Sequence, residues 1–458
     1  MDELVAISGG GLVGPALALE LKRKHSQKIK LFEKRSDIRK SVLGGGRSIN
    51  LIITAKGQKV LADLCLLEDI KPLIRKVTGR AIHDIKGNIT YQPYGRNETE
   101  CNWSISRLEL NKLLLKKLDE ADIPTFFETE VISVDSLEKK AEFSTNGSSQ
   151  MEEFDIFLAA DGVHSNSRKS LVKASQEHRY EPLGVGYKEL TMQATESGEY
   201  ALEPDYLHIW PRGSQMLMAL PNNDSSFTMT LYMPEEDFIP FGERENAEGK
   251  AALLSYFEGQ FPDAFSLMSE LVKEFFHNET GRLGTLYCYP WVFNGNAGLI
   301  GDAAHAIVPF YGQGMNLGLN DISVLSTYLE KTGNWKEALG EYEEHQKKNA
   351  DAMAKMSIEN FQVMCNAVGE KKYHARKAIE QKLESHFPDT YRSQYGLVTY
   401  TLVDYYHAFE IGLLQERMID YLSLSAELNF SDAKDLIEKN LVPYYKKHSL
   451  SLNSYRPV

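Results

Sequence analysis

Three short stretches of this sequence place glycine at the end of an apolar run, and two of them put a carboxylate directly beside it. The first is Gly9-x-Gly11-x-x-Gly14, which lies between an apolar segment and a segment with helical periodicity. Such glycines permit a tight turn, close approach of backbone to a pyrophosphate, and close packing of helix on strand. Glu33 ends the next apolar run, where its carboxylate can accept both hydroxyls of a ribose. The pattern predicts a dinucleotide site and does not separate FAD from NAD.

The other two stretches are Asp161-Gly162 and Gly301-Asp302, each of which follows an apolar, strand-like run. A strand that ends in Gly-Asp can direct a carboxylate at the ribityl hydroxyls of a flavin. The segment 312–316, Gly-Gln-Gly-Met-Asn, then begins a helix whose N–H groups can face the flavin's pyrimidine oxygens. The second and third motifs favour FAD.

Composition excludes several other classes of protein. The net charge of −13 leaves no basic surplus for nucleic acid. Cys65, Cys101, Cys288 and Cys365 are scattered without CxxC pairs, so we expect neither disulfides nor a metal site, and a reducing, cytoplasmic location. No apolar run approaches the roughly 18 residues of a membrane span, the stretch 416–458 included, and we expect no membrane association.

The order of the three motifs resembles the group A flavoprotein monooxygenases, the p-hydroxybenzoate hydroxylase-like family. That resemblance implies FAD as cofactor and NADPH and O₂ as co-substrates, with no catalytic side chain beyond the flavin. It assigns the pyrophosphate-binding arginine to Arg107. The cofactor-binding residues that we expect are Gly9, Gly11, Leu12, Val13, Gly14, Glu33, Arg35, Arg47, Arg107, Asp161, Gly162, Asp302, Pro309, Gly312, Gly314, Met315 and Asn316.

The same resemblance and the texture of the chain predict an α/β (α+β) fold with interleaved domains. A Rossmann-like FAD-binding domain is expected in residues 1–72, 98–180 and 286–325. An antiparallel-sheet substrate domain is expected in 73–97 and 181–285. A helical C-terminal region, 326–458, is expected to cap the active site.

Further segments are similar to one branch of that family, the kynurenine 3-monooxygenases. They are Arg47-Ser48-Ile49-Asn50-Leu51, Gly79-Arg80 with Ile82-His83, Gln92-Pro93-Tyr94-Gly95-Arg96, Tyr187-Lys188-Glu189-Leu190, Leu207-His208-Ile209-Trp210-Pro211 and the stretch 308–316. The resemblance implies that Arg80, Tyr94, Asn360 and Tyr395 bind the amino-acid end of L-kynurenine. An apolar slot for its ring is expected from Leu207, Met216, Met218, Leu220, Tyr232, Pro309, Phe310 and Met364.

The chemistry implied is hydroxylation of L-kynurenine to 3-hydroxykynurenine through a C4a-hydroperoxyflavin, with NADPH docking transiently near Asp161-Gly162 and a homodimer possible. The chain departs from the branch at Val363, where a glutamate is usual, and at Asn320, where an acidic residue is usual. Val363 keeps a hydroxylase of another anthranilate-like or amino-acid-bearing ring open. A related flavoprotein reductase and a non-enzymatic flavin-dependent regulator are the remaining alternatives.

Overall fold

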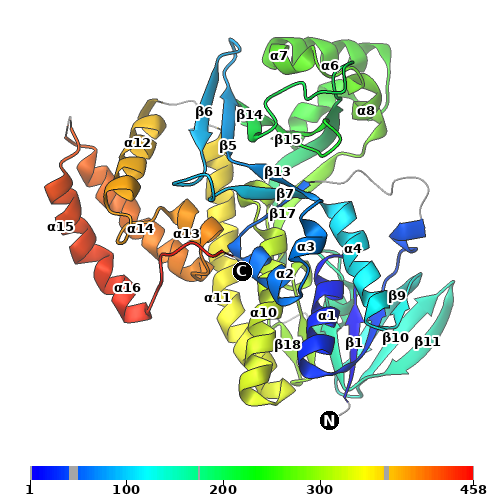
Figure 1. The fold of residues 1–458 in the computed structure, drawn as a ribbon. Coiled ribbons are helices and arrows are strands. Elements are labelled where there is room, and N and C mark those ends of the chain that lie inside the picture. The colour runs from blue at the N-terminus through cyan, green and yellow to red at the C-terminus, as the bar shows by residue number, and fades with distance from the viewer. Residues whose placement is uncertain (1–2, 41–49, 174–175, 366–370, 426, 457–458) are drawn as a thin grey trace.

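The computed structural model describes residues 3–40, 50–173, 176–365, 371–425 and 427–456. In Figure 1 a sheet built around β1 lies at the lower end of the molecule and a second large sheet lies at the upper end. The long helix α11 (Trp335–Cys365) runs between them, and the last helices of the chain lie to the left. The predicted α/β fold, with a parallel sheet, an antiparallel sheet and a helical C-terminal region, is confirmed.

The lower sheet has six strands, and four of its five pairings are parallel, the pairing of β18 with β19 being antiparallel. In sheet order the strands are β18 (Val292–Phe293), β19 (Ala297–Leu299), β12 (Ile156–Ala159), β1 (Leu4–Ser8), β2 (Lys28–Phe32) and β8 (Thr125–Phe126). Helices α1 (Val13–His25), α4 (Arg107–Glu120) and α10 (Gly314–Thr332) pack around it. Because helices cover its faces, the central strands are apolar throughout rather than alternating, as β12 shows with four buried residues.

The upper sheet has seven strands with one parallel pairing, between β5 and β14. In sheet order the strands are β17 (Gly281–Tyr289), β13 (Glu177–Met192), β16 (Phe227–Pro234), β15 (Gln215–Pro221), β14 (Tyr206–Arg212), β5 (Gly79–His83) and β6 (Ile89–Pro93). One face packs on α6 (Ala247–Gln260), α7 (Pro262–Phe265) and α8 (Leu271–His277), which the sequence did not predict within 181–285. The other face looks toward the lower sheet.

Two three-stranded sheets and several short helices complete the region before residue 335. The small sheets are β3 (Asn50–Ile53), β7 (Asn102–Ser106) and β4 (Ile74–Val77), and β11 (Ser148–Glu153), β10 (Lys140–Thr145) and β9 (Thr129–Asp135). The helices are η1 (Ile38–Lys40), α2 (Ala55–Asp63), α3 (Leu67–Ile70), α5 (Asn166–Leu171), η2 (Glu235–Phe241), α9 (Asp302–His305) and η3 (Pro309–Tyr311).

The C-terminal helices after α11 are α12 (Lys371–His386), α13 (Gln394–Tyr400), α14 (Tyr405–Leu422), α15 (Phe430–Asn440) and α16 (Val442–His448). Of these helices, α14 packs on α11 and α13 contacts α2. The chain then returns toward the centre of the molecule (Figure 1), where the N–H of Tyr455 donates to the carbonyl of Tyr400 at 2.7 Å. Among the described residues, none of the helices is both long and apolar enough to cross a bilayer.

The turn from β1 into α1 depends on one close backbone approach. A Cβ added to Gly14 would lie 1.9 Å from the carbonyl oxygen of Gly9, whereas a Cβ on Gly11 would meet no atom within 4 Å. Gly14 therefore lets α1 pack on the end of β1, which is the role that the fingerprint assigned to its third glycine.

We expect Gly14→Ala to lower the free energy of unfolding by about 1–3 kcal/mol, the usual effect of forcing extra atoms into a packed contact. The measurement is the thermal midpoint of the protein freed of cofactor. Gly11→Ala is the matched control, because its added methyl group has room, and its midpoint should equal that of the parent. Equal midpoints for both variants would contradict the packing argument.

Candidate functional site

A cavity of about 600 Å³ lies between the two large sheets. Its walls come from the carboxyl ends of β1 and β12, the starts of α1 and α10, and the inward face of the upper sheet. It extends from Glu33 beside the glycine turn to Arg80 and Tyr395 at the other end. An elongated cleft at the carboxyl ends of parallel strands is where doubly wound folds bind dinucleotides.

Two helices begin at this cavity without a side-chain cap. Leu12 precedes α1 and Gln313 precedes α10, and neither side chain accepts a hydrogen bond from the first turn. Both helix starts line the cavity. Because the first N–H groups of a helix lack partners within the helix, each start can bind an anionic or carbonyl oxygen.

Glu33 is buried directly after β2, and both of its oxygens are held. Oε2 accepts the backbone N–H of Gly10 at 2.6 Å, and Oε1 accepts the backbone N–H and Nε of Arg35 at 2.9 and 2.8 Å. Burial alone raises the pKa of Glu33, but hydrogen bonds from Arg35 and Gly10 outweigh it and place the pKa below its ordinary value. An ionised, oriented carboxylate therefore stands beside the glycine turn.

Asp161, which follows β12, has hydrogen-bond partners for one of its two carboxylate oxygens. Its Oδ2 accepts the backbone N–H and the hydroxyl of Ser167 at 3.2 and 2.9 Å, whereas Oδ1 is buried without a partner among the described residues. The guanidinium of Arg168 donates to the carbonyl of Ala303 at 2.8 Å. Arg168 thus joins the Asp-Gly segment to the Gly-Asp segment, and Asp161 keeps a buried acceptor at the cavity.

The Gly301-Asp302 turn is fixed from behind by Asp321 of α10. Fully buried, Asp321 accepts the N–H of Gly301 at 2.7 Å, Nε2 of His305 at 2.7 Å and Nε2 of Gln346 at 2.6 Å. Burial alone lowers the pKa of His305, but the carboxylate of Asp321 raises it above its ordinary value. With Asp321 holding the backbone, the exposed side chain of Asp302 is free to line the cavity. Asn320 donates to Gln346 at 3.3 Å and so supports the same network.

The far end of the cavity holds a cation among tyrosines. The Arg80 guanidinium lies 5.3 Å from the ring centroid of Tyr94 and 5.8 Å from that of Tyr395, and its Nε is 3.4 Å from the Tyr94 hydroxyl. It forms no salt bridge with any described residue. The Tyr395 hydroxyl accepts Nδ2 of Asn102 at 2.9 Å, and Tyr311 stacks on the Tyr395 ring at 5.8 Å. Such a cation is available for a ligand's carboxylate.

An apolar slot separates this cation from the helix starts. One wall is the inward face of β14, β15 and β16, and the other is the segment around Phe310, whose ring meets Tyr232 edge-on at 5.1 Å. Asn360 of α11 donates to the Phe310 carbonyl at 2.7 Å, and Phe361 stacks on the Phe310 ring at 4.3 Å. The slot suits a flat aromatic group.

The structure brings most of the predicted site residues to this one cavity. Those that line it are Arg80, Tyr94, Asn360, Tyr395, Leu207, Met218, Leu220, Tyr232, Pro309, Phe310 and Met364, and Gly9, Gly11, Leu12, Val13, Glu33, Arg35, Arg107, Asp161, Gly162, Asp302, Gly312, Gly314 and Met315.

Four predicted residues are not part of the described lining. Met216 is fully buried in the core beside the slot, and Gly14 lies behind the turn that it packs. Asn316 is also fully buried, where its side chain accepts the N–H of Thr54 at 2.9 Å and donates to the carbonyl of Ile52 at 2.7 Å. Arg47 falls outside the described residues. Val363 is half-buried on α11 and is not among the lining residues described.

Sequence reasoning missed several polar groups at the cavity. Asn102 on β7 orients Tyr395, and the Gln313 side chain accepts the hydroxyls of Thr54 at 3.1 Å and Tyr405 at 2.8 Å. Thr230 lies two residues from Tyr232 on β16, so strand alternation could have indicated it. Asn102 carries no such signal, because its partner is almost three hundred residues away in the chain.

These features together fit FAD. The start of α1 suits a pyrophosphate, Glu33 suits a ribose, and the start of α10 suits the pyrimidine carbonyls of a flavin. The unpartnered Oδ1 of Asp161 is a further acceptor in the same cavity. The slot between α10 and Arg80 would then hold a small aromatic carboxylate against the flavin.

Comparison with known proteins agrees with this geometry. The family described as FAD binding domain matches residues 2–357. A protein named kynurenine 3-monooxygenase from Myxococcus xanthus is 36% identical over 455 residues, which cover 98% of this chain and 97% of that protein. A protein of the same name from Christiangramia forsetii is 37% identical over 447 residues, covering 97% of this chain and 99% of that protein.

Solved structures show the same fold at low sequence identity. A 2-methyl-3-hydroxypyridine-5-carboxylic acid oxygenase is 20% identical with a TM-score of 0.65, covering 84% of this chain and 96% of that one. A tetracycline destructase is 17% identical with a TM-score of 0.63, covering 84% of this chain and 97% of that one. At these identities the likeness concerns the fold alone.

The state of Glu33 leads to a pH prediction. Because the pKa of Glu33 is depressed in the folded protein, its contribution to stability is complete above the ordinary pKa of a glutamate and is lost as the pH falls below it. We expect the thermal midpoint of the parent to fall more steeply on acidification than that of Glu33→Gln. The measurement is the midpoint against pH in both proteins, and parallel curves would show that Glu33 carries no such contribution.

Proposed function

We propose that this chain, which belongs to the FAD binding domain family and within it to the kynurenine 3-monooxygenases, hydroxylates L-kynurenine to 3-hydroxykynurenine with NADPH and O₂. The observation that carries the proposal is Arg80. Its guanidinium is flanked by aromatic faces and lacks a carboxylate partner among the described residues. It lies at the end of an apolar slot that opens on the part of the cavity lined by the starts of α1 and α10. An aromatic amino acid supplies the missing carboxylate and fills the slot.

The residues divide the work of binding between the two ends of the substrate. Arg80 and the hydroxyls of Tyr94 and Tyr395 bind the carboxylate of kynurenine, with Asn360 close to the amino-acid end. The ring lies between the wall of β14, β15 and β16 and the Phe310 segment, which excludes water from the reacting carbon. When bound, FAD accepts hydride from NADPH and activates O₂ for transfer to the ring. That cofactor is held beside the slot by the starts of α1 and α10 and by the carboxylates of Glu33, Asp161 and Asp302.

The finer assignments are part of the same proposal. Residues 1–72, 98–180 and 286–325 form the FAD-binding domain, residues 73–97 and 181–285 form the substrate domain, and residues 326–458 cap the site. A cytoplasmic location is proposed from the cysteines, since Cys65, Cys101, Cys288 and Cys365 are all free thiols. A homodimer and docking of NADPH near Asp161-Gly162 stay predictions.

The alternatives fit the cavity less well. A reductase for isoprenoid chains would have to bury apolar substrate against the Arg80 guanidinium, which is costly. A hydroxylase for another ring is the stronger competitor, because Val363 replaces the usual glutamate. Mass spectrometry of products after incubation with L-kynurenine, NADPH and air decides between them, and anthranilate-like acids serve as comparison substrates. Absence of 3-hydroxykynurenine from FAD-loaded protein would reject the proposed function.

We expect Arg80→Met to raise the KM for kynurenine about ten- to a hundredfold, since a charge-assisted hydrogen bond contributes about 1.5–3 kcal/mol. FAD occupancy, read from the visible absorbance of the purified protein, should not change. Arg282→Met is the matched control, because Arg282 lies on the same sheet with 78% of its side chain exposed. An unaltered KM in Arg80→Met would place the carboxylate elsewhere.

A further inference from the structure

Two buried histidines that the proposed function does not use meet on the face of the upper sheet that is turned away from the cavity. His83 ends β5 and His208 lies on β14, and both are buried with 1% exposure. Nδ1 of His83 is 2.8 Å from Oδ2 of Asp263, and its Nε2 is 2.9 Å from Nδ1 of His208. Nε2 of His208 is 2.8 Å from the carbonyl oxygen of Glu203. The four groups form one continuous hydrogen-bonded chain.

The two ends of this chain are acceptors. Asp263 of α7 also receives Nε1 of Trp210, at 3.0 and 2.9 Å from its two oxygens, which suits an ionised carboxylate. Burial alone raises the pKa of Asp263, but the hydrogen bonds from His83 and Trp210 bring it below its ordinary value. The Glu203 carbonyl at the other end has no proton to give.

The ring of His208 is neutral in this environment. Burial lowers the pKa of His208 to about 4, so the ring carries a single proton at neutral pH. That proton must lie on Nε2, because Nε2 faces the Glu203 carbonyl and two acceptors at 2.8 Å would repel each other. Nδ1 of His208 is therefore a bare acceptor, and the proton between the two rings must belong to His83.

We propose that His83 is a buried imidazolium, protonated on both nitrogens and paired with Asp263, and that it is a positioning residue for Arg80. The first half follows from proton counting, because Nδ1 must donate to the Asp263 carboxylate and Nε2 must donate to His208. With the Asp263 carboxylate ionised, three ring protons on the two histidines supply a donor for each of the three contacts.

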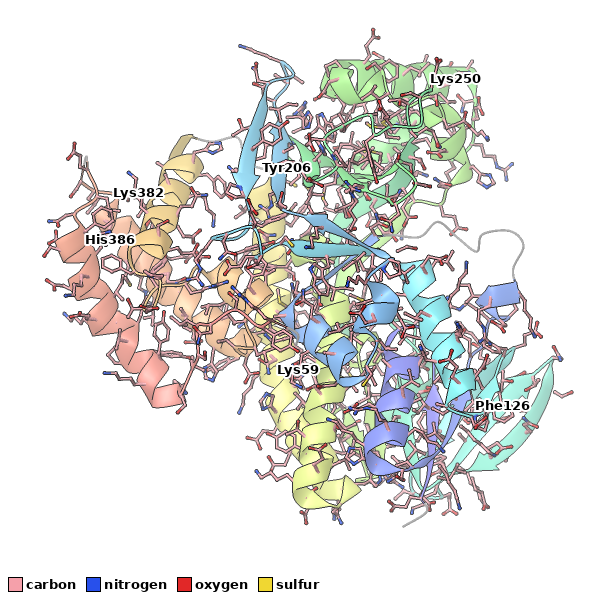
Figure 2. All side chains as sticks on the ribbon, viewed as in Figure 1. Lys59, Phe126, Tyr206, Lys250, Lys382 and His386 are labelled. Carbon is pink, nitrogen blue, oxygen red and sulfur yellow. The ribbon has the colours of Figure 1, made fainter. Side chains whose placement is uncertain are left out.

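The positioning role follows from where the histidines lie in the sheet. The hairpin of β5 and β6 carries Arg80 and leads into Tyr94, and among the described strands it joins the sheet through the parallel pairing of β5 with β14. Arg80 pairs in register with Leu207 on the cavity face, while the His83–His208 contact crosses the same seam on the opposite face. In Figure 2 the labelled Tyr206 marks the start of β14 beside the hairpin, where its ring packs on Tyr91 of β6 at 4.7 Å.

A positively charged side chain near the pair acts in the opposite sense to Asp263. Arg212 of β14 donates Nη1 to the carbonyl of His83 at 3.1 Å and Nη2 to the carbonyl of Asp84 at 3.3 Å. Its positive charge opposes a second cation, so the imidazolium depends on the Asp263 carboxylate. Besides Asp263, His208 is a titratable side chain in contact with His83. The ring of Trp210 stacks on the ring of His83 at 4.1 Å.

The proton count is tested directly by nitrogen NMR of the holoenzyme labelled at histidine. We expect three protonated ring nitrogens from His83 and His208 at neutral pH, assigned with His83→Gln and His208→Gln. Two protonated nitrogens, one on each ring, would overturn the proposal. This measurement needs no substrate, so it stands apart from the proposed function on which the Arg80 role rests.

The positioning role is tested with Asp263→Asn, which keeps the shape of the side chain and removes its charge. We expect loss of the third ring proton and a KM for kynurenine raised roughly three- to tenfold, with kcat and FAD occupancy within about twofold of the parent. His277→Gln, on α8 of the same layer, is the control. An unchanged KM, or a loss of kcat as large as the rise in KM, would overturn the role, whereas no turnover in the parent itself would count against the proposed function instead.

Discussion

The buried carboxylate of Asp321 is the interaction on which the geometry of the site depends. It binds the N–H of Gly301, the ring of His305 and the amide of Gln346, so it joins the end of β19, the start of α9 and the long helix α11. Burying a charge is costly unless the charge is hydrogen-bonded, and three donors bind this carboxylate. Because Asp321 belongs to α10, the same contact sets the direction in which that helix presents its first turn to the cavity.

The rest of the cavity follows from that anchor. The segment between α9 and α10 contains Phe310, which forms one wall of the slot, and α11 supplies Asn360 to hold its backbone. The opposite wall belongs to a different sheet, so the width of the slot depends on packing between the two halves of the molecule. α11 extends along both halves (Figure 1) and contacts α10 as well as β14 and β15, so it links the helix start at the cavity to the sheet wall of the slot.

The sequence allowed prediction of those parts that local patterns determine. A glycine turn, a strand that ends in a carboxylate and a helix start are each encoded within a few residues, so Glu33, Asp161 and Asp302 could be placed at one edge of a sheet. Strand alternation also indicated which side chains of β15 face the cavity side of the sheet. It could not indicate how far along β15 the cavity extends. Met216 shares that face with Met218, and the core covers Met216 before the cavity begins.

What local patterns could not predict are contacts made across the chain. Residue spacing does not indicate which distant segments of the chain meet. Three features depend on such meetings: the parallel pairing of β5 with β14, the Asn102–Tyr395 hydrogen bond and the packing of helices α6 to α8. His83 and His208 illustrate the limit. Both stood in segments that resembled a family, but a single buried histidine in a strand has no evident role until its partner is known.

Under the proposed function, the way in which Arg80 is stabilised explains how an apolar cavity can recognise an amino acid. A salt-bridged arginine would have to exchange one carboxylate for another, with little net gain. Aromatic faces instead stabilise the guanidinium by about 0.5–2 kcal/mol, which suffices to hold the side chain in place and leaves its charge uncompensated. A bound carboxylate would then gain a charge-assisted interaction with the guanidinium. Selection for an acid group would thus arise from the lack of a carboxylate partner for Arg80 among the described residues as much as from the arginine itself.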